Sequence, residues 1–346
     1  MKLLLPHIGR WRKLRIVVDR AVSLPCPGLD LCGNAATLTR LQPESKLDQP
    51  ARRNTIDPLA ENFQTPALNE LITSGHIFRD AYLLSPKSLA SITTLTISHY
   101  MVDSKPFFIH HLMHCLYRLQ NLTNLELMYL DLDCSSEGRG LDDDQQLDIE
   151  RMHFQGMHVS SLSSFYRAAN YPRFIYLTFV WCELTEPIHM GGCTKLNLCN
   201  LSPDSGIRIL LEDWDGDNTL FVIQCSNFNG HVLQQLSEEV SIGEWLCPRM
   251  TSLVVAYSTS FTSENLQRMV QAHREEHAKS GFADWDDLDD TIPSIESLLA
   301  FRCSDLASKD KAWFDNNVQY VSWDEWWGGM NIGAFMAGNA DDFESQ

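Results

Sequence analysis

A nine-residue pattern recurs along this chain and restricts its fold more than any other feature of the sequence. In LTNLELMYL, which starts at Leu122, apolar residues fill positions one, four and six of the nine. The same frame fits ITTLTISHY from Ile92, FIYLTFVWC from Phe174, DNTLFVIQC from Asp217, MTSLVVAYS from Met250 and IESLLAFRC from Ile295. Less close matches are WRKLRIVVD from Trp11 and LNELITSGH from Leu68. Such recurrence predicts a protein built from stacked repeats.

The alternation of apolar residues at positions four and six predicts a short strand with one buried face, and position nine then turns the chain off the strand. Segments of helical period lie between the frames, over residues 107–119, 229–240 and 263–280. A strand followed by a helix, repeated, predicts parallel strands with the helices outside them. We therefore expect an α/β solenoid with a curved parallel sheet on its concave side and helices on its convex side.

The repeats are irregular, because their starts lie 24 to 57 residues apart. Some of these gaps are long enough to hold degenerate repeats, one of them around TKLNLCNLS at 194–202. We expect about eight to ten repeats over residues 1–322, and a C-terminal tail or cap over 323–346. The tail contains Trp323, Trp326 and Trp327, which need burial in some part of the molecule.

Cysteines occupy position nine in three of the frames, as Cys182, Cys225 and Cys303. A small, mostly buried residue with a weak S–H donor suits a site beneath the turn that follows a strand. The ten cysteines form no CxxC pair and no secretory signal accompanies them, which favours reduced thiols in the cytosol or nucleus.

The consensus L-x-x-L-x-L-x-x-C resembles the cysteine-containing subtype of the leucine-rich repeat. Three longer segments, LLPHIGRWRKLRI, IRILLEDWDGDNTLFVIQCSNFN and CPRMTSLVVAYSTSFTSENLQRMV, are similar to the repeat regions of F-box proteins that are abundant in fungi. This resemblance covers nearly the whole chain. It implies a substrate-recognition part of a cullin-RING ubiquitin ligase, which holds a protein substrate on the concave face.

An F-box is a helical module that precedes the repeats and binds a Skp-type adaptor, and this chain begins where such a module would end. We expect contacts with the adaptor and the cullin only if an F-box is supplied upstream. A free-standing leucine-rich-repeat scaffold without a ligase role is the alternative.

The formal net charge of −18 argues against a nucleic acid or an anionic membrane surface as the partner. Much of this charge lies in local clusters over residues 142–144, 212–217 and 284–290, which we interpret as solvated loops. No apolar run approaches the length that a membrane helix needs, about 20 residues. The basic N-terminal stretch is compatible with a mitochondrial presequence, but Trp11, Leu14 and Ile16 fit a first strand.

The string HREEH over residues 273–277 matches the H-x-x-E-H pattern of inverted zinc peptidases, so a zinc hydrolase using His273, Glu276 and His277 is a distant alternative. Both histidines continue the apolar stripe of the helix over 263–280, however, and we expect them to pack against the sheet. No third ligand follows at a recognisable distance.

Two further motifs resemble metal sites. The cluster IHHLMHC places His110 and His114 one helical turn apart, in a segment whose apolar residues indicate an amphipathic helix. EDWDGDN over 212–218 departs from a calcium loop, because its glycine is misplaced and no closing glutamate follows. No phosphate-binding loop or nucleophile elbow occurs. We expect no catalytic residue, metal or cofactor, and therefore a protein that is not an enzyme.

A binding face is the more promising feature. Residues at positions two, three, five, seven and eight of each frame are expected to point away from the core, and those at position eight form a row across neighbouring strands. Tyr, Trp and Arg in this row are the residue types that dominate binding hot spots. The candidate partner-binding residues are His99, Tyr129, Tyr176, Trp181, Phe221, Tyr257 and Arg302. Cover by loops or by the C-terminal tail is the alternative for this row.

Overall fold

A computed structural model of the chain contains two compact units, Met1–Phe174 and Ile175–Gln346. The structure describes residues 5–20, 23–25, 27, 30–47, 62–83, 89–101, 105–135, 147–170, 172–188, 190, 192–214, 216, 218–241, 244–279 and 292–331. Each unit is an α/β array of parallel strands and helices, as the sequence predicts.

The first unit contains a parallel sheet in the order β1-β3-β5-β6-β7-β8. Its strands are β1 (Lys13–Arg20), β3 (Arg40–Leu47), β5 (Glu70–Ser74), β6 (Thr94–Tyr100), β7 (Asn124–Leu130) and β8 (Arg151–Gln155). A second small sheet pairs β2 (Gly33–Asn34) with β4 (Phe63–Gln64). The helices are η1 (Leu5–Arg10), α1 (Gly75–Ile77), the π-helical turn η4 (Phe78–Tyr82), α2 (Ile109–Leu116) and α3 (Val159–Ala168).

The second unit repeats this arrangement in the order β9-β10-β11-β14-β15-β16-β17, with β17 antiparallel to β16. Its main strands are β9 (Tyr176–Val180), β10 (Lys195–Cys199), β11 (Thr219–Ile223), β14 (Ser252–Ala256), β15 (Ser297–Phe301), β16 (Tyr320–Trp323) and β17 (Trp326–Gly328). A small hairpin joins β12 (Glu239–Ser241) and β13 (Glu244–Trp245). The helices are α4 (Ile207–Glu212), α5 (Gly230–Gln235), α6 (Ser263–Lys279) and α7 (Ser308–Asn317).

Leucines at position four form one buried row in each unit. In the first unit the register aligns Leu14, Leu41, Leu71, Leu95, Leu125 and Met152. In the second it aligns Leu177, Leu196, Leu220, Leu253, Leu298 and Val321. All of these side chains except Leu14 are at most 1% exposed. Full burial of a leucine contributes about 2 kcal/mol, so this row is a main source of stability in each unit.

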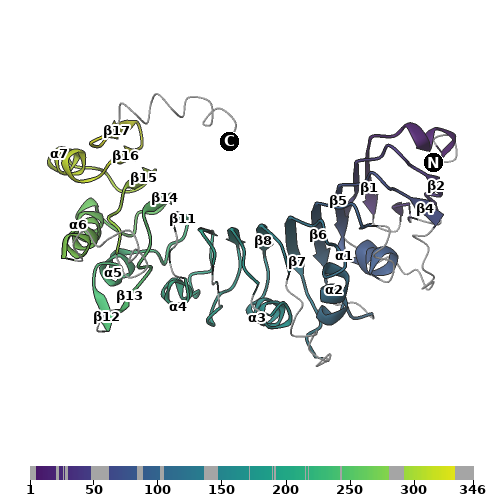
Figure 1. Cartoon of the computed structure of the whole chain (residues 1–346), viewed down its shortest axis with the longest axis horizontal. Helices are drawn as coiled ribbons and strands as arrows, with labels where there is room; N and C mark the ends of the chain where they lie inside the picture. The colour runs from purple at the N-terminus through teal and green to yellow at the C-terminus, as the bar shows by residue number, and fades with distance from the viewer. Residues whose placement is uncertain are drawn as a thin grey trace. The chain divides into compact units, whose positions relative to one another are not determined.

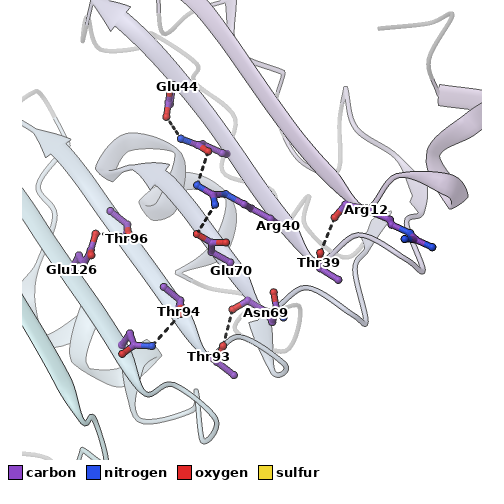
Figure 2. A network of polar contacts seen from close by, with 12 residues as sticks. Arg12, Thr39, Arg40, Glu44, Asn69, Glu70, Thr93, Thr94, Thr96 and Glu126 are labelled. Carbon is purple, nitrogen blue, oxygen red and sulfur yellow. Dashed lines mark hydrogen bonds and ion pairs between the residues drawn. The ribbon is translucent and has the colours of Figure 1, made fainter. Parts of the chain in front are cut away.

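A backbone ladder at position two joins successive repeats. The carbonyl of Arg12 accepts N–H bonds from Thr39 and Arg40, and the carbonyl of Asn69 accepts them from Thr93 and Thr94. The hydroxyls of Thr39 and Thr93 donate to the same two carbonyls, at 2.9 and 3.2 Å (Figure 2). Thr194 and Thr251 repeat this contact in the second unit. A threonine at position two therefore adds a side-chain hydrogen bond to this ladder in the repeats that have one.

The helices of each unit lie on one side of its strands (Figure 1). The predicted helices over 107–119 and 263–280 are confirmed as α2 and α6, whereas the segment 229–240 forms only the short helix α5 before entering β12. The opposite side of each sheet is not covered by these helices, and we call it the open face. Residues at positions three, five and seven point to it, because side chains alternate along a strand.

Three strands in the frame were not identified from sequence: β3, β8 and β16. The degenerate repeat expected around 194–202 is confirmed as β10. At the C-terminal end, β16 and β17 cross the boundary expected at 322/323, with Trp323 pairing with Trp326 and Ser322 with Trp327. Trp323 is 3% exposed and donates its indole N–H to the carbonyl of Ser304 at 3.0 Å.

Candidate partner-binding surface

Residues at position eight share an unusual backbone conformation. Their φ angles are positive, at 54° for His99, 51° for Tyr129, 51° for Trp181, 56° for Gln224, 55° for Tyr257 and 48° for Arg302. This left-handed conformation costs a non-glycine residue roughly 1 to 2 kcal/mol. The chain therefore makes the same sharp turn at position eight in each of these repeats, and the residue at position nine that follows is buried in all of them except Cys303, which is half-buried.

This turn exposes large side chains at the edge of the open face. Trp181 is 54% exposed and Tyr257 is 47% exposed, although both side chains are mostly apolar. Glycine or asparagine would adopt the same turn at a lower cost, and Asn200 does so after β10 (φ 50°). The conformation recurs with polar residues such as Gln224, so it belongs to the turn itself, and the exposure of two large aromatic side chains is what makes this edge a candidate contact surface.

The open face of the second unit is mainly apolar. Phe221 and Ile223 of β11, Val254 of β14, and Leu299 and Phe301 of β15 point to it from adjacent strands, and we call these five residues the apolar patch. Four of them are half-buried and Phe301 is 47% exposed. A parallel sheet side with this composition is normally covered in a protein, which makes the patch a candidate contact surface.

Tyr257 and Arg302 extend the apolar patch at the end where the strands turn. The ring of Tyr257 packs edge-on against Phe301, with their centroids 5.5 Å apart. The guanidinium of Arg302 lies 5.5 Å from the centre of the Tyr257 ring and 5.4 Å from that of Phe301. Such cation–π contacts orient the arginine without neutralising its charge.

Tyr176 is the first residue of β9 and Trp181 follows its last, and β9 lies two strands from Phe221 in β11. The ammonium of Lys195 lies 5.1 Å from the centre of the Tyr176 ring. The predicted residues Tyr176, Trp181, Phe221, Tyr257 and Arg302 therefore belong to one open face. Sequence reasoning missed Lys195 and Phe301, although their places at positions three and seven of the frame were a usable signal.

Part of the C-terminal segment lies beside this surface. Trp327 pairs with Ser322, whose other neighbour is Leu299 of the apolar patch. Trp327 is 37% exposed and Ser322 is 9% exposed, so β17 extends the sheet edge and shields Ser322. The rest of the expected tail, residues 332–346, lies outside the described part of the chain.

His99 and Tyr129 lie in the first unit, where their rings stack with centroids 5.1 Å apart and planes 7° apart. Gly156 follows β8 at position eight, and a side chain there would collide with the Tyr129 ring. Gln155 donates a hydrogen bond to the Tyr129 hydroxyl at 2.9 Å. These rings are therefore held by contacts between neighbouring repeats, and Tyr129 is half-buried.

The open face of the first unit is polar and pairs its own charges. Arg40 contacts Glu70 at 3.3 Å, Arg15 contacts Glu44 at 3.0 Å, and the Thr96 hydroxyl donates to Glu126 at 2.8 Å. Figure 2 shows the chain of contacts that runs from Glu44 to Glu70 across neighbouring strands. Surface ion pairs of this kind contribute little stability, about 1 kcal/mol or less each, but they leave few charges unmatched.

The thiols at position nine are bound beneath the turns, as predicted. The Sγ of Cys225 lies 3.4 Å from the carbonyls of Leu198 and Ile223, and that of Cys303 lies 3.5 Å from those of Val255 and Phe301. Burial raises the pKa of both thiols. Cys199 faces the open side, but burial, followed by the nearby Cys225, raises its pKa to about 11. These groups stay protonated at neutral pH and are poor nucleophiles.

The HREEH segment forms the last turns of α6. His273 is fully buried, as expected, with its Nε2 3.1 Å from the carbonyl of Leu236 and its ring packed edge-on against Trp245. The expectation for His277 is wrong, because its side chain is exposed, with Nδ1 3.0 Å from the carbonyl of Ile292. Glu276 pairs with Lys279 at 2.9 Å. The geometry gives the two histidines separate backbone partners rather than a shared metal.

His110 and His111 of α2 lie with ring centroids 4.1 Å apart. Burial, and then the proximity of His110 and His114, lowers the pKa of His111. Within the described ranges, no group of three or more His, Cys, Asp or Glu side chains is placed to hold a metal ion. Likewise, none of the helices described here combines the length and apolar character required to cross a membrane.

Most residues of the acidic clusters lie outside the described part of the chain. They are residues 142–144 and 284–290, together with Asp215 and Asp217 of EDWDGDN. Trp214, in the middle of that motif, is 1% exposed and donates its indole N–H to the carbonyl of Cys193 at 2.7 Å. The motif therefore anchors the connection between α4 and β11 through its tryptophan.

Comparisons with known proteins give little. No family model matches the chain, and no curated protein is similar to it in sequence. Among solved structures, the TLR13–ssRNA13 complex aligns with a TM-score of 0.35 and 10% identity, over 90% of this chain and 48% of that one. The chain thus spans about half the length of that protein, and a similarity this low assigns neither fold nor function.

Proposed function

We propose that the chain is a protein-recognition module that performs no chemistry and needs no cofactor. The observation that carries this proposal is the open face of the second unit, where strained turns hold Trp181 and Tyr257 exposed beside the apolar patch. Large apolar and aromatic side chains gathered at one exposed surface are characteristic of protein–protein contacts. A protein partner would bury these side chains on association.

The more specific proposal is that this module receives substrates for a cullin-RING ubiquitin ligase. It rests on the resemblance of the repeats to those of F-box-like proteins, and it requires a Skp-type adaptor and a cullin that bind through an F-box supplied upstream. The role of this chain would be geometric, since it holds a substrate while other subunits transfer ubiquitin. Such a role places the protein in the cytoplasm or the nucleus. A free-standing scaffold uses the same surface without the ligase.

Affinity capture from cell extract tests both levels. The chain is compared with a Trp181→Ala/Tyr257→Ala variant and with a His99→Ala/Tyr129→Ala variant, after circular dichroism has shown that all three are folded. Mass spectrometry should identify proteins that are lost only with the first variant. Recovery of Skp and cullin subunits supports the ligase role, whereas partners without them indicate a scaffold. Partners that persist in the first variant place the binding site elsewhere.

A further inference from the structure

β9 to β15 and their turns place residues at positions three, five, seven and eight on the described open face. Two of these residues are charged, and both are cations. They are Lys195, at the start of β10, and Arg302, after β15. The whole chain has a net charge of −18, so a stretch of strands with two cations and no carboxylates at these described positions differs from the rest of the protein, and exposed carboxylates follow the next strand, β16, at Asp324 and Glu325. This local charge restricts the chemistry of a partner.

Neither cation makes an ion pair within the described residues, since the contacts of both are with aromatic rings. In the first unit, by contrast, Arg15 and Arg40 are paired with glutamates. Three acidic residues lie near this end of the sheet: Glu296 precedes β15, Asp324 accepts the backbone N–H of Arg302 through Oδ1 at 2.5 Å, and Glu325 follows Asp324 after β16. None of these carboxylates forms an ion pair with the Arg302 side chain within the described residues. The Arg302 guanidinium therefore remains available to a carboxylate of another molecule.

Lys195 and Arg302 lie at opposite corners of the apolar patch. The register places Lys195 three strands away from β15, and Arg302 five positions further along the frame. With strands about 4.8 Å apart and about 3.3 Å per residue, the two positions are separated by roughly 20 to 25 Å along a diagonal. An extended chain crosses this distance in about seven residues. The diagonal passes near Phe221 on β11 and between Val254 and Ala256 on β14.

We propose that the open face of the second unit binds an extended segment of a partner protein that carries two carboxylates about six or seven residues apart, with aliphatic or aromatic side chains between them. One carboxylate pairs with Lys195 and the other with Arg302, while the apolar side chains cover the patch. This inference rests on the proposed protein-recognition function and specifies the partner's chemistry.

A protein segment fits these observations better than a nucleic acid. Affinity for nucleic acid comes largely from cations that neutralise many phosphates, and this face offers two. The surrounding negative charge of the chain would repel a densely charged strand. A segment with two carboxylates meets this repulsion only weakly, because charges beyond about 8 to 10 Å are screened at physiological salt.

The first test is a selection of random 12-residue displayed peptides on the full chain, with removal of those that also bind the Trp181→Ala/Tyr257→Ala variant. The expected result is enrichment of peptides with two Asp or Glu residues six or seven positions apart and apolar residues between them. Enrichment of basic peptides, or of apolar peptides without the two acids, would overturn the inference and leave protein recognition standing. Failure to select any peptide specific for this face would count against both.

The second test reverses the charges on both sides. For a selected peptide, Lys195→Glu and Arg302→Glu should each weaken binding at least tenfold. Replacing the matching acid of the peptide with Lys should restore binding to one of these variants and not to the other. Arg118→Glu, an exposed residue after α2 in the first unit, changes the net charge equally and should leave the affinity within twofold. Equal losses in all three variants would show a general charge effect and refute the pairing.

A single-stranded 15-nucleotide poly(U) probe tests whether the anionic ligand of this face is a nucleic acid instead of a protein segment. We expect no binding above background at 150 mM salt. Binding of this probe that is lost with Lys195→Glu and Arg302→Glu would replace the protein segment with a nucleic acid.

Discussion

The two units use the same repeat frame, and they differ on their open faces. In the first unit this face contains arginines and glutamates that pair across strands, such as Arg40 and Glu70. In the second it contains the apolar patch and two cations without carboxylate partners. The buried leucine rows are alike in both. Positions one, four and six therefore determine the fold, while positions three, five, seven and eight are free to determine what the surface binds.

The largest effect should come from the buried rows, and it should be the same in both units. Leu125→Ala and Leu253→Ala each remove a fully buried side chain from position four. Each should lower the free energy of unfolding by about 3 kcal/mol, because both the burial and the packing of the side chain are lost. Urea denaturation monitored by circular dichroism measures this. A change below about 1 kcal/mol in one variant would show that the two rows are not equivalent.

The next prediction concerns binding. It uses a variant that makes the open face of the second unit resemble that of the first. Val254 and Leu299 are neighbours on β14 and β15, and Val254→Arg with Leu299→Glu would place an ion pair there. Because both side chains are only half-buried, stability should change by about 1 kcal/mol or less. Binding of a selected peptide should fall at least tenfold, measured by fluorescence anisotropy. Retained affinity would show that the apolar patch does not contribute to peptide binding.

The turn at position eight should give a smaller effect that depends on backbone conformation. Gln224 is exposed and has φ 56°. Gln224→Val should destabilise the protein by about 1 to 2 kcal/mol, since a β-branched residue tolerates this conformation poorly. In Gln224→Gly, relief of strain offsets the greater freedom of the unfolded chain, and the change should stay within about 0.5 kcal/mol. Thermal melting of both variants ranks them, and the reverse order would contradict the left-handed turn.

The smallest predicted effect is a dependence of the free energy of unfolding on pH. Burial lowers the pKa of His273 in the second unit, so the folded state binds its proton less readily than the unfolded state, whose imidazole pKa is about 6.5. Stability should therefore fall as the pH drops below about 7, towards the pKa of the folded state. His273→Phe should weaken this dependence between pH 8 and pH 5.5 in urea titrations. His231→Phe is the control, because His231 is exposed.

Strands whose frame positions hold apolar residues were predicted from the sequence. Strands with proline or polar residues in the frame were missed, because contacts with neighbouring strands stabilise them. β3 was missed because Pro43 and Glu44 occupy positions six and seven, and it pairs with β5 at Arg40 and Leu41, before the proline. β8 was missed because RMHFQ has a polar character outside Met152 and Phe154.

The candidate surface was predicted in part. The aromatic row at position eight followed from the frame, but its left-handed backbone did not, because that conformation depends on the turn as a whole. The division of the row between two units could not be predicted either, since it depends on long-range contacts rather than on local spacing. The place of Phe301 at position seven indicated that it faces outward, but its contacts with Tyr257 and Arg302 depend on the packing of neighbouring strands.

The buried thiols at position nine can serve as reporters of local opening in the second unit. Cys182 and Cys225 are inaccessible beneath their turns, and burial holds the pKa of Cys225 above its usual range. An alkylating reagent can reach such a sulfur only when the turn above it opens. The rate at which each cysteine is modified in the native protein therefore reports how often its own repeat opens, one turn at a time along the array.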